Sequence, residues 1–122
     1  MNDKHIRMAR GESRSYRCTV TSDSVAYSLN GCSLSFTVKS KLTHTDGQAL
    51  FQLYIGSGIT INNTTGGIYT LDISAANTSL APKDDSNLKY YFDHRIKTSA
   101  GGVKQLEAGE FVITPNVTDT IV

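Results

Sequence analysis

The stretch richest in reactive side chains is LKYYFDHRIK, residues 88–97. Asp93, His94 and Arg95 follow one another there, and they carry the carboxylate, imidazole and guanidinium groups that enzymes use in catalysis. On a β-strand, however, successive side chains point to opposite faces. Asp93 and His94 would therefore point away from each other, and they cannot form a base and its orienting partner. We predict a protein that is not an enzyme.

Alternation divides this strand into a core face and an outer face. His94 shares its face with Phe92 and is expected to be a neutral, hydrogen-bonded core histidine, so His94→Leu is expected to cost little stability and to leave function intact. Tyr91, Asp93 and Arg95 share the outer face, where Asp93 and Arg95 are predicted to form a surface ion pair of small energy. These three residues are the predicted interface.

The remaining candidate groups give no pattern that predicts a catalytic, cofactor or metal site. His5, His44 and His94 are far apart in the sequence and show no metal-binding spacing. Asp84 and Asp85 lack the D-x-D-x-D-G pattern of a calcium loop. The chain has no G-x-S-x-G nucleophile motif, and we predict that it uses no cofactor, small-molecule substrate or metal.

The two cysteines, Cys18 and Cys32, are predicted to be free thiols on core faces of two strands, and the sequence leaves open whether they touch. The N-terminus lacks the apolar stretch of a signal peptide, so synthesis in the cytosol is expected. A net charge of +1 does not suggest binding to nucleic acid or to a membrane. A mild basic cluster from Lys4 to Arg17 is interpreted as the solvated edge of a sheet.

Apolar and polar residues alternate along most of the chain, and this period of two is typical of half-buried strands. The clearest case is residues 32–39, where Cys32, Leu34, Phe36 and Val38 alternate with polar residues. The other predicted strands are residues 16–20, 50–55, 59–61, 67–73 and 111–114, with turn residues between them. One short helical turn is predicted at 74–80. We predict an all-β fold, a single Ig-like antiparallel β-sandwich of about 7–9 short strands spanning residues 1–122.

Five segments, in order and spacing, resemble the Ig-like β-sandwich domain of tailed-phage structural proteins, including the N-terminal domain of baseplate upper proteins and related small tail and neck proteins. The segments are ARGES at 9–13, SLNGCSLSFTVKS at 28–40, GGIYTLDISAANTSL at 66–80, YYFDHRI at 90–96 and AGEFVITPNVT at 108–118. The chain departs from the family pattern at Ser28, His94 and Asn116.

This resemblance implies a virion structural protein of the tail, baseplate or neck, made in the cytoplasm of the host bacterium or encoded by a prophage. Its partners would be other copies of itself and neighbouring virion proteins, contacted through sheet edges and loops. A head-decoration or fibre-attachment role is an alternative within this class. A carbohydrate-binding or adhesion module is the second alternative, with Tyr54, Tyr69 and Tyr91 as candidate stacking residues.

Overall fold

The computed structural model describes residues 2–117, with side chains from His5 onward, and its regular structure is mostly β. Eight strands form one curled sheet in the order β1-β10-β9-β5-β6-β7-β8-β2. These strands are β1 (Asn2–Ala9), β2 (Arg14–Thr19), β5 (Ser33–Lys39), β6 (Phe51–Ile55), β7 (Gly58–Asn63), β8 (Ile68–Ile73), β9 (Leu88–Lys97) and β10 (Val103–Thr114). A separate hairpin consists of β3 (Thr21–Ser22) and β4 (Val25–Ala26).

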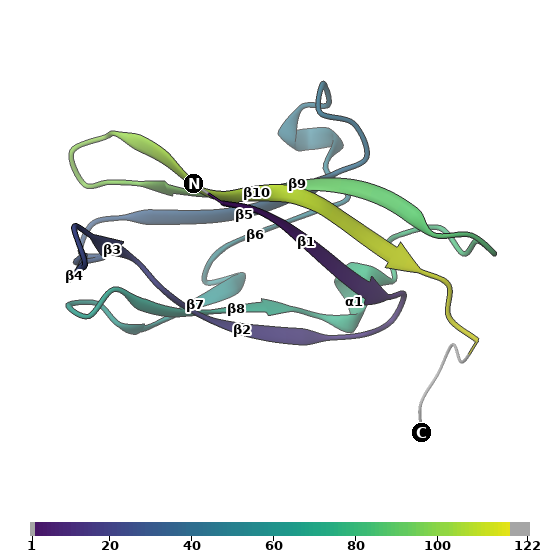
Figure 1. The fold of residues 1–122 in the computed structure, drawn as a ribbon, viewed down its shortest axis with the longest axis horizontal. Helices are drawn as coiled ribbons and strands as arrows, with labels where there is room; N and C mark the ends of the chain where they lie inside the picture. Colours follow the sequence, from purple (N-terminus) through teal and green to yellow (C-terminus); the bar gives the residue numbers. More distant parts are fainter. Residues whose placement is uncertain (1, 118–122) are drawn as a thin grey trace.

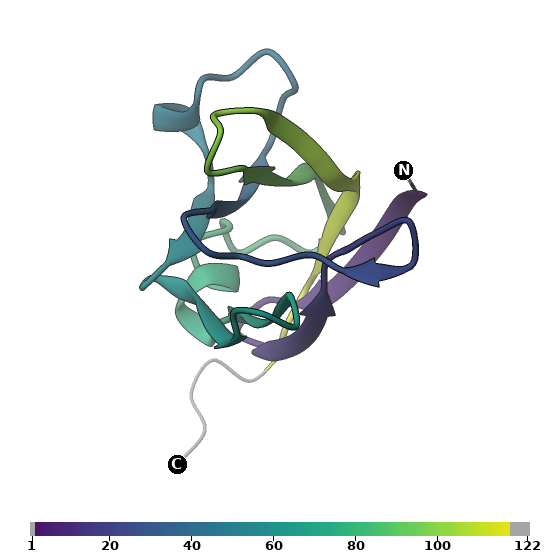
Figure 2. The same ribbon diagram turned by 90° about the vertical axis from the view of Figure 1, so that its left-hand side faces the viewer.

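The curled sheet makes two layers that enclose one core. In Figures 1 and 2 the strands β1, β10, β9 and β5 form one layer, β7, β8 and β2 form the other, and β6 passes between them. The strands alternate as predicted, and Phe36 of β5 lies at the centre of the core with its ring 5.2 Å from that of Phe92. The prediction of an Ig-like all-β fold is confirmed.

The prediction that the sandwich is antiparallel is wrong at two places. β1 runs parallel to β10, from Asn2 opposite Glu107 to Ala9 opposite Thr114. β6 and β7 also pair in parallel, over two residues on each strand. A strand near the chain terminus has no hairpin to set its direction, so the alternating pattern alone could not reveal that β1 runs parallel to β10.

Two short helical segments connect the strands. The 3₁₀-helix η1 (Asp46–Gln48) lies in the loop between β5 and β6, which stands above the sheet at the top of Figure 1. The predicted turn near 74–80 is present as α1 (Ala75–Thr78), where the Ser74 hydroxyl accepts a hydrogen bond from the Asn77 N–H. No helix within residues 2–117 has the length and apolar character needed to cross a bilayer.

Two features of the layer that contains β5, β9 and β10 differ from the sequence pattern. The last strand is much longer than predicted, because β10 begins at Val103 rather than near 111 and forms a long hairpin with β9. Thr37, on the polar face of β5, is only 5% exposed. The Gln52 amide donates a 3.0 Å hydrogen bond to the Thr37 hydroxyl, and this bond offsets the loss of water around the buried hydroxyl.

Candidate functional site

The three residues predicted to form an interface lie together on the outer face of β9. Tyr91, Asp93 and Arg95 line a groove of about 440 Å³. Gln105, Ala108, Gly109 and Glu110 of β10, and Thr37, Lys39 and Leu42 from β5 and the loop that follows it, also line the groove. The pleat of β9 and its pairing with β5 and β10 therefore set the floor of the groove.

The loop between β5 and β6 is held over one side of this groove by Lys39. Its ammonium group lies 2.9 Å from the Asp46 carboxylate and donates a 3.0 Å hydrogen bond to the His44 carbonyl. Leu42, within the anchored loop, has 77% of its surface exposed. The groove therefore combines an exposed apolar side chain with a floor of regular β-structure.

The charged groups beside the groove are paired. Arg95 donates a 3.0 Å hydrogen bond to Asp93, as the sequence predicted. Lys89 lies 2.5 Å from the Glu110 carboxylate, which lowers the pKa of Glu110 and raises that of Lys89. The Lys89 ammonium is also 5.8 Å from the centre of the Tyr91 ring. Because both pairs are exposed to solvent, they contribute more to the orientation of the side chains than to stability.

The inner face of β9 carries His94, which is 3% exposed and therefore lies in the core as predicted. The partner of its imidazole is the Tyr69 hydroxyl of β8, 2.8 Å from Nε2. Burial raises the pKa of the Tyr69 phenol well above its usual value, and the nearby Cys18 raises it further. Tyr69 is thus neutral and can complete a hydrogen bond with either tautomer of a neutral imidazole.

This contact changes the expected effect of His94→Leu. Leucine would leave the buried Tyr69 hydroxyl without its imidazole partner, so we expect the free energy of unfolding to fall by about 1–3 kcal/mol instead of a negligible amount. Tyr69→Phe should cause a loss in the same range, about 1–3 kcal/mol. The double variant should lose at least about 0.5 kcal/mol less than the sum of the two, because both partners are then apolar. Urea unfolding of the four proteins measures this coupling.

A matched control is available on the same face of β9. Tyr90 is buried but its hydroxyl makes no hydrogen bond within the described residues. Tyr90→Phe should therefore change the free energy of unfolding by no more than about 0.5 kcal/mol. Additive losses in the Tyr69 and His94 variants would show that the two side chains are not coupled.

The structure also places the other candidate residues. Cys18 and Cys32 are not joined by a disulfide bond, and each is half-buried against the core. No group of three or more His, Cys, Asp or Glu side chains in the described part of the chain is arranged to hold a metal ion. Tyr69 is 1% exposed and cannot stack on a ligand, which contradicts its candidacy for carbohydrate binding, whereas Tyr54 is 54% exposed.

Sequence reasoning found the β9 side of the groove and missed the β10 and loop residues. The β10 side comes from a long hairpin in which the strand registers shift between Gln105 and Glu107. Gly101 and Gly102 are turn residues in the sequence, but they did not show that the strand extends back from residue 111 to Val103. Leu42 is an isolated apolar residue in a polar segment, and it was the one sign in the sequence that the loop between β5 and β6 contributes to the groove.

Comparisons with known proteins do not assign the chain to a family. No family model matches the chain, and no curated protein matches its sequence. One similar solved structure is the NK cell receptor Nkp44, a triggering partner in natural cytotoxicity, at 13% identity and a TM-score of 0.48, covering 95% of this chain and 100% of that one. Another is CopC from Methylosinus trichosporium OB3b, at 16% identity and a TM-score of 0.42, covering 95% and 87%.

Proposed function

We propose that this protein is a non-enzymatic structural component of a tailed-phage virion, of the tail, baseplate or neck, and that the groove over β9 receives a neighbouring virion subunit. The observation that carries the proposal is the groove itself, lined by Tyr91, Asp93 and Arg95 beneath an anchored loop. The order and spacing of the sequence motifs support the phage assignment.

The composition of the groove favours a protein partner. Tyrosine and arginine are enriched among the residues that contribute most to protein interfaces. Tyr91 supplies a large ring with few rotatable bonds, and Leu42 supplies exposed apolar surface. Ala108 and Gly109 keep the β10 side of the floor low, so a partner backbone can approach closely. Because the floor is regular β-structure, little ordering entropy is lost on binding.

The experiment is co-expression of the full chain with the products of the adjacent genes, followed by size-exclusion chromatography with light scattering. We expect a stable oligomer or complex. Tyr91→Ala should weaken the association by at least about tenfold, because an aromatic anchor at an interface contributes 1–2 kcal/mol or more. Tyr54→Ala is the matched control, since it removes an exposed tyrosine from β6, outside the groove.

A strict monomer with no affinity for any virion protein would contradict this proposal. The second candidate function is carbohydrate binding, which is favoured by the exposed ring of Tyr54 and by the polar groups around Tyr91. A glycan array distinguishes the two functions. Specific glycan binding that is lost in Tyr91→Ala or Tyr54→Ala, without protein association, would support the carbohydrate-binding function instead.

A further inference from the structure

The curled sheet does not close on itself. Its first and last strands, β1 and β2, are neighbours in space, yet no strand pairing joins them within residues 2–117. We call the gap between these two strands the seam, and it contains a cleft of about 660 Å³. The cleft is lined by His5 and Ile6 of β1, by residues 16–19 of β2 and the two residues that follow them, and by Leu106 and Glu107 of β10. It reaches down to Tyr69 and His94.

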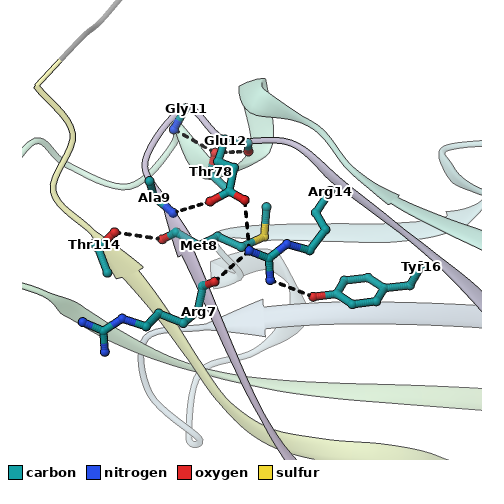
Figure 3. Close-up of polar contacts among 9 residues, drawn as sticks. All are labelled: Arg7, Met8, Ala9, Gly11, Glu12, Arg14, Tyr16, Thr78 and Thr114. Atoms are coloured by element: carbon teal, nitrogen blue, oxygen red, sulfur yellow. Dashed lines mark hydrogen bonds and ion pairs between the residues drawn. The ribbon is translucent and has the colours of Figure 1, made fainter.

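One end of the seam is closed by side chains (Figure 3). Arg14 of β2 donates a 3.1 Å hydrogen bond to the Arg7 carbonyl of β1, and its guanidinium also contacts Glu12 and Tyr16. Glu12 accepts a 2.9 Å hydrogen bond from the Ala9 N–H. The Glu12 carboxyl consequently has a lowered pKa, chiefly because of that backbone N–H. The other end of the seam, beside His5 and Cys18, is the part that the cleft occupies.

The backbone of β1 presents N–H and C=O groups to this end of the seam. In a parallel ladder the N–H and C=O of one residue point to the same side, and consecutive residues alternate. The Arg7 carbonyl and the Ala9 N–H both bond toward β2, whereas the Met8 carbonyl accepts a hydrogen bond from Thr114 of β10. By the same alternation, the N–H and C=O of His5 and the N–H of Arg7 face the seam. An extended segment lying in the seam could therefore add to β1 as a strand.

The charges around the seam select the partner. Residues 2–19 hold five of the twelve Lys and Arg residues but only two of the eleven Asp and Glu residues. The Arg7 and Arg17 side chains are exposed, and neither has an ion pair or hydrogen bond with another described residue. Pairing of these edges between two copies would bring like charges together, which opposes self-association. An acidic segment would be attracted instead.

We infer that the seam binds one extended acidic segment of a partner protein, which adds to the free edge of β1 through the backbone of His5 and Arg7. Its carboxylates would meet Arg7 and Arg17. Its inward side chains would be apolar, because Ile6 and Leu106 line the cleft. The segment would therefore alternate acidic and apolar residues. This site lies apart from the β9 groove and does not depend on the function proposed for it.

The test uses the full chain and a fluorescent eight-residue peptide in which Glu alternates with Val. A second peptide with Lys in place of Glu controls for charge. By fluorescence anisotropy the acidic peptide should bind at least about tenfold more tightly than the basic one, and more weakly as salt is raised. The peptide should also slow alkylation of Cys18, which lines the cleft, but not of Cys32, which does not.

Two pairs of variants test the geometry. His5→Pro removes the N–H that faces the seam, and proline is tolerated on a free strand edge, so this variant should fold and lose at least about tenfold in affinity, whereas His5→Ala should lose less than about threefold. Arg17→Glu should likewise weaken binding by at least about tenfold. Lys41→Glu makes the same charge change in the exposed loop after β5 and should leave affinity unchanged.

Circular dichroism establishes that each variant is folded. Equal binding of both peptides, or no saturable binding of the acidic peptide, would overturn the inference. Full affinity in folded His5→Pro would also overturn it. Self-association that is lost in His5→Pro would show that a second copy occupies the seam and would equally overturn it.

Discussion

Replacing Gly67 with alanine is expected to lower the free energy of unfolding by about 3–5 kcal/mol, near the upper end for a single substitution. Gly67 has a φ of +69°, which residues other than glycine adopt only with strain. A Cβ atom there would lie 2.6 Å from the carbonyl oxygens of both Tyr27 and Val20. Because these are backbone atoms, the chain itself would have to move. The Val20 N–H also donates a 2.8 Å hydrogen bond to the Gly67 carbonyl, and this contact would be disturbed.

The neighbouring Gly66 is the control. Its backbone is not in the left-handed region, and an added Cβ would meet the Asn63 side chain at 3.0 Å. That side chain is exposed and can shift, at the cost of the 2.9 Å hydrogen bond that it accepts from the Gly66 N–H. Gly66→Ala should therefore change the free energy of unfolding by less than about 1 kcal/mol. Urea unfolding of the two variants measures the difference. Equal losses at the two positions would contradict the explanation based on backbone conformation and the contact with two carbonyl groups.

Replacing Phe36 with alanine is expected to cost about 3–5 kcal/mol, the usual loss for a fully buried aromatic side chain. Phe36 is 1% exposed and contacts the rings of Phe51, Phe92 and Phe111, with which it shares the centre of the core. These rings belong to four different strands, so a cavity at Phe36 would loosen both sides of β5. The regular backbone around the site limits how far the core can collapse to fill the space.

Thermal and urea unfolding measure this loss, and Leu42→Ala is the control for the removal of apolar atoms. Leu42 is exposed, so its truncation should change the free energy of unfolding by no more than about 0.5 kcal/mol. A loss below about 1 kcal/mol in Phe36→Ala would mean that the two layers repack freely, which is not expected of a close-packed interior.

The sequence predicts the core well because hydrophobic burial follows a local rule. Phe36 and Val38 alternate with polar neighbours, and both are buried. Alternation also divided β9 correctly, with His94 inside and Asp93 paired to Arg95 outside. Thr37 is the exception, since it is buried on the polar face, where it lies between Gln52 of β6 and Asp93 of β9. The alternating pattern of one strand contains no information about the side chains of its neighbours.

The alternating pattern cannot predict contacts between segments that are distant in the sequence. The partner of His94 is Tyr69, on a different strand 25 positions away, and only the packing of β8 against β9 brings the two rings together. The parallel pairing of β1 with β10 joins the two ends of the chain. Neither contact has a local signature, because each depends on how the whole sheet curls.

The sequence by itself determined the fold class, the faces of the main strands and the residues on the outer side of β9, because each follows from a period of two along one strand. Only the tertiary structure decided that Tyr91, Asp93 and Arg95 form the floor of a groove, since that requires the β10 hairpin and the anchored loop. It also decided which of two adjacent glycines has a positive φ and no space for a Cβ atom, and that β1 and β2 face each other without pairing. These properties arise from the approach of segments far apart in the chain, where backbone groups and side chains meet only once the sheet has curled.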